Sequence, residues 1–521
     1  MPDIILSTLN ARYIHSALGL RYLLANMGEL QHQTTIKEYV IHSRPIDIVE
    51  DLLALQPRII GFSVYIWNVE PLTQVVSLLK RVRPDIIVVL GGPEVSYETE
   101  QQAICQDADY VICGAADLEF ASLCQSLISI KPSADSTPLY TIKKITAAPV
   151  DLTELQMPYP FYTDEDIRQR IIYVEASRGC PYKCEFCLSA LDKTAVPFEL
   201  DNFLLEMQRL YERGARRFKF VDRTFNLKIE SSIRILEFFL QRLSNDLFLH
   251  FELIPDHLPD RLKDVITRFP PGSLQFEIGI QSFNPQVQTI IKRKQNTERT
   301  LENLRWLREH SHAHLHTDLI IGLPGEDMQS IAAGFDQLVG LNPHEIQVGI
   351  LKRLRGSPII RHTETHAMVY NPHPPYNILQ TSKIDFATMQ RLTRFARYWD
   401  IIANSGRFKH TLPLILQNQA FNNFLTLSDW LFRTTGQTHK IALDRLFTLL
   451  YAASSDLFSD RKDAIQVSLG QDFLLTGAKH LPDFFHDIQN IEKRTSDKTL
   501  VPEKRRAGNS VIPKRQARHL N

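Results

Sequence analysis

Short apolar runs alternate with amphipathic stretches along the first quarter of the chain. The runs have the length of buried strands, and the stretches between them repeat apolar residues at helical spacing. Strands are predicted at Ile4–Leu6, Thr35–Val40, Ile59–Val64, Ile86–Leu90 and Tyr110–Ile112. Five strands separated by helices predict a doubly wound, Rossmann-like parallel sheet of the α/β class over residues 1–135.

The same alternation returns in the middle of the chain, after a predicted linker at residues 136–164. Strand-like runs occupy Ile171–Glu175, Phe218–Asp222, Leu247–Ile254, Leu274–Ile280, His316–Ile321 and Glu345–Leu351. Six strands with helices between them predict an incomplete (β/α)6 barrel of the TIM type over residues 165–370. Chemistry on such barrels lies at the carboxyl ends of the strands.

The pattern changes again after the proline-rich segment Tyr370–Tyr376. Apolar residues then recur at helical spacing, which predicts an all-helical domain over residues 371–490. From Lys493 to Asn521 there are nine Lys or Arg residues against two Asp or Glu residues and few apolar ones. Residues 491–521 are therefore expected to form a basic disordered tail.

Length and composition narrow the class of protein. A chain of 521 residues predicts about three domains, and six cysteines are too few for a disulfide framework. No apolar run reaches the roughly 20 residues of a membrane span, and no secretory signal precedes the first strand. The 59 basic and 59 acidic residues balance, so nucleic acid is not an expected partner. A cytoplasmic protein is predicted.

Three cysteines within eight residues carry the most specific chemistry. Cys180, Cys184 and Cys187 form a C-x3-C-x2-C motif beside Gly179, which is typical of a loop. Three thiolates can hold three irons of a 4Fe–4S cluster and leave the fourth iron open to a ligand. The alternative is a zinc site with a distant fourth ligand such as His250.

The motif, with Phe186 before its last cysteine, resembles the cluster loop of radical S-adenosylmethionine enzymes. The resemblance implies that S-adenosylmethionine binds the open iron and is cleaved by one electron to a 5′-deoxyadenosyl radical. It also implies an external electron donor such as flavodoxin or ferredoxin. Phe186 is then expected beside S-adenosylmethionine.

Polar residues at the predicted strand ends match further segments of that family. Asp222 resembles the contact to the methionyl amine, while Glu277 and Gln281 resemble the segment that meets the ribose and the carboxylate. Arg293 on the following helix could pair with that carboxylate. The alternatives are structural: Asp222 could cap a helix, Glu277 could point outward, and Arg293 could be solvated.

The first domain resembles the cobalamin-binding domain that precedes many radical S-adenosylmethionine barrels. The residues that carry the likeness, and that are expected to contact cobalamin, are Ser63, Gly91, Gly92 and Pro93. There are two departures. The Asp-x-His-x-x-Gly signature for a cobalt-binding histidine is absent, and the Gly-Glu-Gly-Glu turn after the last strand is replaced by Gly114–Asp117. The alternative is a substrate-handling remnant without cofactor.

The remaining cysteines lie in the first domain and are predicted to be small buried hydrophobic residues. Cys105, Cys113 and Cys124 could otherwise hold a second cluster, as in methylthiotransferases, whose cysteines are spread more widely.

The resemblance as a whole is to the cobalamin-binding radical S-adenosylmethionine subgroup with a C-terminal helical domain of unknown function. It implies an enzyme in which cobalamin delivers a methyl group to an unactivated carbon of a small molecule, lipid or peptide. The alternatives are a radical oxidation, rearrangement or cyclisation, with or without cobalamin, and a non-catalytic iron–sulfur or electron-transfer protein.

Overall fold

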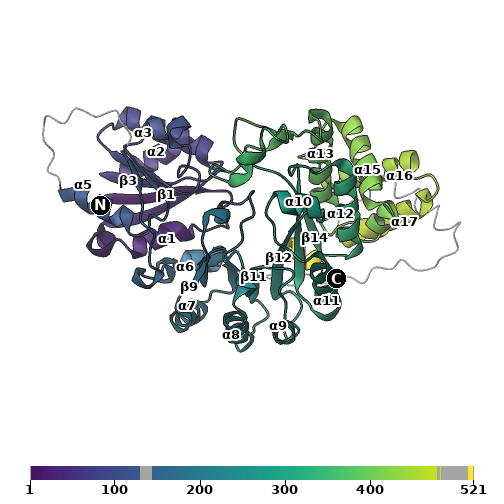
Figure 1. Cartoon of the computed structure of the whole chain (residues 1–521), viewed down its shortest axis with the longest axis horizontal. Helices are drawn as coiled ribbons and strands as arrows, with labels where there is room; N and C mark the ends of the chain where they lie inside the picture. Colours follow the sequence, from purple (N-terminus) through teal and green to yellow (C-terminus); the bar gives the residue numbers. More distant parts are fainter. Residues whose placement is uncertain (1, 130–142, 478–481, 483–513, 520–521) are drawn as a thin grey trace. The chain divides into compact units, whose positions relative to one another are not determined.

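The computed structural model describes residues 2–129, 143–477, 482 and 514–519. The chain divides into two compact units (Figure 1). The first unit contains Met1–Phe225, Lys352–Ile360 and Asn371–Asn377, and the second contains Asn226–Leu351, Arg361–Tyr370 and Ile378–Asn521.

A six-stranded parallel sheet forms the N-terminal part of the first unit, in the order β2-β1-β3-β4-β5-β6. Its strands are β1 (Ile4–Asn10), β2 (Thr34–Val40), β3 (Ile59–Ser63), β4 (Ile87–Gly91), β5 (Tyr110–Cys113) and β6 (Lys143–Thr146). The five predicted strands are confirmed, and β6 adds a sixth strand within the range predicted as a linker. The order reverses between β1 and β3, and ligands of open α/β sheets bind at such a switch point.

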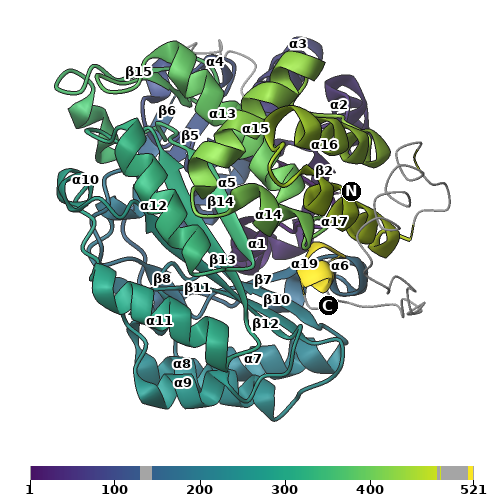
Figure 2. The ribbon, with the colours of Figure 1, turned by 90° about the vertical axis from the view of Figure 1, so that its right-hand side faces the viewer.

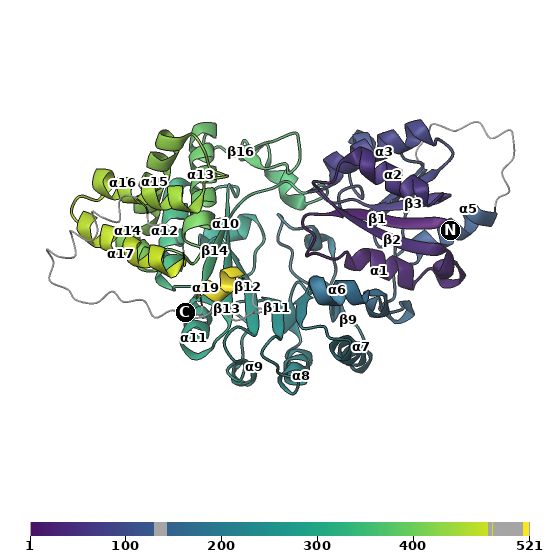
Figure 3. The same ribbon diagram turned by 180° about the vertical axis from the view of Figure 1, so that it is seen from behind.

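Helices cover both faces of this sheet (Figure 3). They are α1 (Leu18–Ala25), α2 (Pro45–Ala54), α3 (Val69–Val82), α4 (Ala103–Gln106) and α5 (Glu119–Ser129). One apolar cluster joins α2 and α3 to strand residues such as Ile5 and Ile60. A second joins α1 and α5 to Ile4 and Leu6, because successive strand residues point to opposite faces. The strands β1, β3, β4 and β5 are thus covered on both faces, whereas the edge strand β6 is largely exposed.

The first unit also contains the start of the predicted barrel. Strand β7 (Ile172–Val174) pairs in parallel with β10 (Arg217–Phe220), and β8 (Ser177–Gly179) pairs with β9 (Ala195–Pro197) as an antiparallel hairpin. The helices here are α6 (Asp164–Gln169) and α7 (Leu200–Glu212). The three cysteines lie in the connection between β8 and β9.

Four further parallel strands belong to the second unit: β11 (Phe248–Leu253), β12 (Leu274–Gln281), β13 (His314–Ile321) and β14 (Glu345–Ile350). The helices between and around them are α8 (Ile229–Leu240), α9 (Asp260–Ile266), α10 (Pro285–Ile290), α11 (Thr297–His310) and α12 (Met328–Gly340). Along β12 the apolar Phe276 and Ile278 are fully buried, and they alternate with the polar Gln275 and Glu277. All six predicted barrel strands are therefore present.

The C-terminal part of the second unit is helical, as predicted (Figure 2). Its helices are α13 (Phe386–Ile402), α14 (Thr411–Leu416), α15 (Ala420–Thr435), α16 (Leu443–Leu457) and α17 (Lys462–Leu475), with the short strands β15 (Val369–Tyr370) and β16 (Ile378–Gln380) before them. Phe335 of α12 contacts Phe395, Trp399 and Phe421 edge-on. These aromatic contacts pack the C-terminal helices against the helix that precedes β14. No helix among the described residues is long and apolar enough to cross a membrane.

The end of the chain differs from the expected disordered tail where the structure describes it. Residues 491–513 and 520–521 lie outside the described residues, but Lys514–His519 form the helix α19. Arg515 of α19 pairs with Glu345 and with Asp400, at 2.8 Å in each case. The partly buried Glu345 side chain thus supplies the counter-charge that holds this basic helix in place.

Candidate cofactor-binding sites

The cysteine loop is held at its base by the β8–β9 hairpin. Gly179 ends β8 with a φ of +98°, and a Cβ at this position would lie 2.3 Å from the Thr194 carbonyl oxygen. Only glycine fits this approach of two backbones. The conformation of the residue before Cys180 is therefore fixed by the fold.

None of the three thiols is in a disulfide, and Cys184 and Cys187 lie near enough to Cys180 to influence its pKa. Cys180 and Cys184 are buried and Cys187 is half-buried. Burial raises the pKa of the Cys180 thiol, and the nearby Cys187 and Cys184 raise it further. A thiol in such a setting ionises more readily when a cation is bound, because the thiolate is the ligand form.

The ligand set fits a cluster better than a single ion. Among the described residues, no group of three or more His, Cys, Asp or Glu side chains is arranged to hold one metal ion. A cubane cluster takes each thiolate on a different iron, so its ligands surround a volume and do not converge on a point. Cys180, Cys184 and Cys187 supply three such thiolates from one loop, and among the described residues no fourth ligand completes a zinc site with them.

Asp222 follows β10 and fastens the strand that leads into the loop. Its carboxylate accepts a 2.6 Å hydrogen bond from the Ser177 hydroxyl and a 3.0 Å hydrogen bond from the Ala176 amide. Asp222 is 2% exposed, and burial raises its pKa to about 7. Asp222, which is predicted to contact the methionyl amine, thus holds the start of β8 in the structure. Phe186 lies half-buried between Glu185 and Cys187.

The other residues predicted to contact S-adenosylmethionine lie on or near β12 of the second unit. Glu277 lies 3.0 Å from His250 Nε2. Gln281 has a φ of +70° at an irregularity of the β12–β13 pairing, and its side chain lies over Gly279. Arg293 donates to the Gly279 carbonyl oxygen. The Gln281 Oε1 atom is buried without a hydrogen-bond partner in the structure, as expected of a group that meets a ligand.

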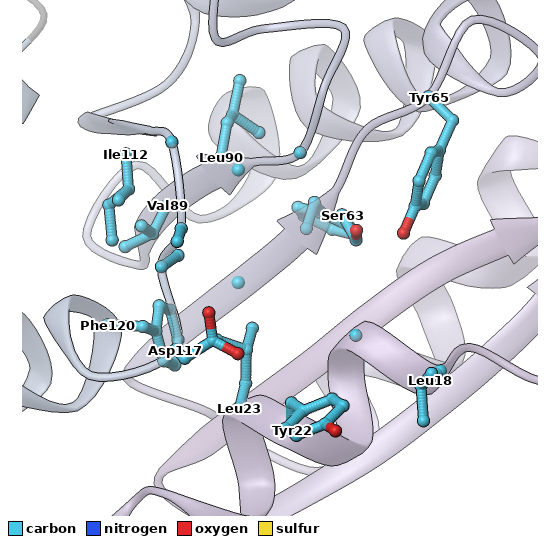
Figure 4. A pocket seen from close by; sticks show the side chains of 18 of the residues that line it. Leu18, Tyr22, Leu23, Ser63, Tyr65, Val89, Leu90, Ile112, Asp117 and Phe120 are labelled. Carbon is cyan, nitrogen blue, oxygen red and sulfur yellow. The ribbon is translucent and has the colours of Figure 1, made fainter. Parts of the chain in front are cut away.

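A cavity of about 340 Å³ opens at the carboxyl ends of β3, β4 and β5 in the first unit (Figure 4). Of the residues predicted to contact cobalamin, Ser63, Gly91 and Gly92 line it, whereas Pro93 is exposed and is not among the lining residues. The other lining residues are Leu18, Gly19, Tyr22, Leu23, Gly61, Phe62, Tyr65, Val89, Leu90, Ile112, Gly114, Ala115, Ala116, Asp117, Phe120, Glu175 and Arg178.

The cavity has features of a site for a large ligand. Gly92 has a φ of +108°, and a Cβ there would lie 2.5 Å from the Val64 carbonyl oxygen. At Gly91 and Gly114 a Cβ would only reach ordinary van der Waals contact, with its nearest atom at 3.8 Å. The Tyr22 hydroxyl, buried beside the Glu175 carboxylate, has no hydrogen-bond partner of acceptable geometry. Apolar walls with few polar groups are typical of cofactor pockets.

No motif or spacing in the sequence indicates Arg178, which lines this cavity. Its Nη1 lies 3.1 Å from both carboxylate oxygens of Asp117, and its Nη2 donates to Glu175 Oε1 at 2.7 Å. Burial opposes its charge, but Glu175 and Asp117 raise the pKa of the guanidinium above its ordinary value. Asp117 is 61 residues from Arg178 in the chain, and no spacing rule links two such residues.

A second ion-pair group connects the loop after β4 to the segment Lys352–Ile360 of the same unit. Arg353 makes a two-bond pair with Glu98, at 2.8 Å for each bond. Arg355 bonds to Glu94 at 3.0 Å and to Glu98 at 2.8 Å. The Gly91–Gly92 turn directly precedes Glu94, so these pairs fix the far side of the turn that lines the cavity.

Three family models match the chain. The B12 binding domain matches residues 5–123, the radical SAM superfamily matches residues 174–338, and a protein family of unknown function, DUF4080, matches residues 364–519. The first range contains strands β1 to β5, the second contains the cysteine loop and strands β8 to β13, and the third contains the helical domain with α19.

Curated relatives are distant. The uncharacterized methyltransferase PH0819 of Pyrococcus horikoshii is 24% identical over 61% of this chain and 71% of its own length. The cobalamin-dependent radical SAM methyltransferase TokK of Streptomyces tokunonensis is also 24% identical, over 57% of this chain. The chain covers 47% of TokK, so it spans about half of that relative.

A solved structure shares the fold. The cobalamin-dependent S-adenosylmethionine radical enzyme OxsB, with aqua-cobalamin bound, superposes with a TM-score of 0.60 at 14% identity. The match covers 95% of this chain and 84% of OxsB. The cofactors of this protein class are a 4Fe–4S cluster, S-adenosylmethionine and cobalamin. The chain belongs to the radical S-adenosylmethionine enzymes that carry a cobalamin-binding domain, and to the subgroup with a C-terminal DUF4080 domain.

Proposed function

We propose that this enzyme transfers a methyl group to an unactivated carbon of a small molecule, lipid or peptide. The observation that carries the proposal is that one compact unit contains both the three-cysteine loop and the glycine-lined cavity. The methyltransferase names of the two relatives support it. An external electron donor such as flavodoxin or ferredoxin supplies the reducing electrons.

Each site residue has a role under this proposal. Cys180, Cys184 and Cys187 hold the cluster, and Asp222, Glu277, Gln281, Arg293 and Phe186 contact S-adenosylmethionine. Ser63, Gly91 and Gly92 contact cobalamin, and the exposed Pro93 shapes their turn. When bound, the cluster and S-adenosylmethionine supply a hydrogen-abstracting radical, and cobalamin supplies the methyl group.

The protein's own part in the reaction is to position groups and to exclude water. Asp222 fixes β8 through Ser177 and Ala176, and the positive φ of Gly179 then sets the direction in which the loop leaves the hairpin. Val89, Leu90 and Ile112 give the cavity buried apolar walls. Exclusion of water by such walls strengthens the polar contacts that remain.

The test uses the full chain, purified without oxygen, with its cluster rebuilt and hydroxocobalamin added. It is reduced in the presence of S-adenosylmethionine that carries a deuterated methyl group. The expected products are 5′-deoxyadenosine and deuterated methyl groups recovered with the extracted cobalamin. Both should be absent from Cys184→Ala.

Two other outcomes would contradict the proposal. Formation of 5′-deoxyadenosine with no label on the cobalamin would favour a radical oxidation, rearrangement or cyclisation. Failure to form 5′-deoxyadenosine with an intact cluster would favour a non-catalytic iron–sulfur or electron-transfer protein.

A further inference from the structure

Arg178 belongs to both cofactor sites of the first unit. Its side chain lines the cavity at the ends of β3 to β5, and its backbone is part of β8, two residues before Cys180. Among the residues that line the cavity, Arg178 forms ion pairs with the carboxylates of Asp117 and Glu175.

The two carboxylates that hold Arg178 come from different parts of the unit. Asp117 ends the turn that follows β5, and this turn lines the cavity from Gly114 onward. Glu175 directly follows β7 and leads into β8. Asp117 is 9% exposed and Glu175 is 8% exposed, so both pairs are largely withdrawn from water. Breaking such a pair on one side leaves a buried charge without its partner, which is costly.

Two aromatic rings lie beside the guanidinium of Arg178. Arg178 lies 4.8 Å from the ring centroid of Tyr22 in α1 and 5.8 Å from that of Phe198 after β9. The rings of Tyr22 and Phe198 are themselves nearly parallel, at 19°. A planar group that lies beside two rings and is bonded to two carboxylates has little freedom to rotate. Lysine could not reproduce this arrangement, because it offers a point charge and no plane.

We infer that Arg178 is a positioning residue through which cobalamin binding in the cavity and cluster assembly in the cysteine loop affect each other. A ligand that displaces the turn ending at Asp117 must either move Arg178 or break a buried ion pair. Movement of Arg178 passes to Cys180 through Gly179, whose Cα lies so close to the Thr194 carbonyl oxygen that no Cβ fits between them. Coupling between two binding sites is reciprocal, so each cofactor should alter the affinity for the other.

The experiment compares cobalamin affinity in two forms of the full chain, with and without the rebuilt cluster. Hydroxocobalamin is titrated into each form without oxygen, and its absorbance gives the two dissociation constants. For the natural sequence we expect their ratio to differ from one by at least about 5-fold, the lower end of typical couplings. In Arg178→Lys and in Asp117→Asn the ratio should approach one.

A matched control is an exposed ion pair of the same sheet domain. Arg83 bonds to Asp85 at 2.6 and 2.8 Å, away from the lining residues. Arg83→Gln should keep the ratio of the natural sequence. Circular dichroism and thermal unfolding show which variants fold. If Arg178→Lys does not fold, Asp117→Asn replaces it in the comparison, because this variant keeps the Arg178–Glu175 pair.

The reciprocal readout is the electron paramagnetic resonance spectrum of the reduced cluster, recorded with and without cobalamin. Cobalamin should shift the spectrum of the natural sequence and leave that of Arg178→Lys unchanged. A ratio of one in the natural sequence, or the same ratio in a folded Arg178→Lys protein, would overturn the inference. Neither measurement needs turnover. The coupling through Arg178 can therefore fail its test while methyl transfer is confirmed, and methyl transfer can fail its test while the coupling is confirmed.

Discussion

The Ser177 hydroxyl donates a 2.6 Å hydrogen bond to the Asp222 carboxylate. Ser177 stands three residues before Cys180, the first cysteine of the loop. The Ala176 amide donates to the same carboxylate at 3.0 Å. These bonds connect the end of β10 to the start of β8, and Asp222 is fully enclosed. The geometry of the cysteine loop therefore depends on a buried acid whose pKa is raised to about 7, chiefly by burial.

Asp222→Asn should change how the stability of the cofactor-free protein depends on pH. Between about pH 4 and pH 7 the folded carboxyl keeps a proton that the unfolded chain has released. The free energy of unfolding should therefore fall as pH rises through this window, by up to about 1.4 kcal/mol per pH unit from this group. Asparagine removes that contribution.

The measurement is urea unfolding at a series of pH values from 5 to 8. Glu326, whose pKa burial also raises to about 7, is common to both proteins and cancels in the comparison. The curve for the natural sequence should be steeper than that for Asp222→Asn. Parallel curves would show that Asp222 is not protonated in the folded protein.

Cys184→Ala should abolish the iron–sulfur absorbance and the cleavage of S-adenosylmethionine, because the cubane loses one of its three thiolates. Cys124 is the matched control. It is fully buried in the apolar core, and burial raises its pKa to about 12, so it has little thiolate to offer a metal. Cys124→Ala should keep the full iron content, and a loss of iron there would instead favour a second cluster.

Gly92→Ala should weaken cobalamin binding by more than 10-fold and destabilise the sheet by about 1–3 kcal/mol. Its Cβ would lie 2.5 Å from the Val64 carbonyl oxygen, so the turn must move. Gly214→Ala is the control, since Gly214 has a similar φ of +100° but no atom within 4 Å of its Cβ. That variant has the backbone strain without the collision, and it should bind cobalamin normally. Equal binding by both variants would mean that the Gly92 turn does not shape the site.

Arg515→Gln should lower the free energy of unfolding by about 1–3 kcal/mol, because it leaves the buried Glu345 carboxylate without its cation. Arg518 of the same helix donates to the neutral Ser405 carbonyl oxygen at 2.8 Å, so Arg518→Gln should cost less. Chemical unfolding followed by tryptophan fluorescence compares the two. Equal losses would show that the ion pair does not hold α19.

The sequence predicts most of the fold, because the apolar runs of both sheets are continuous and regularly spaced. It does not predict β6, since Lys143–Thr146 is largely exposed and has no apolar run. Nor does it predict α19, because a basic segment such as Lys514–His519 has the composition of a disordered tail. The stability of that helix comes from Glu345 and Asp400, which are more than 100 residues away.

Some residues of the candidate site are predictable from the sequence, and others are not. The cysteines and the Gly91–Gly92 turn are recognisable because their chemistry requires local spacing. Arg178 and Asp117 are not, because their pairing arises only when the turn after β5 meets the strand before the cysteine loop. Long-range ion pairs of this kind depend on the tertiary fold and have no local signature.

The most direct test of the account is metal analysis of the full chain after anaerobic reconstitution. It is compared with a variant in which Cys180, Cys184 and Cys187 are all replaced by alanine. The natural sequence should hold about four irons with matching sulfide and about one cobalt per chain. The variant should lose the iron and keep the cobalt. Zinc in place of iron, or the absence of cobalt from the natural sequence, would contradict the account.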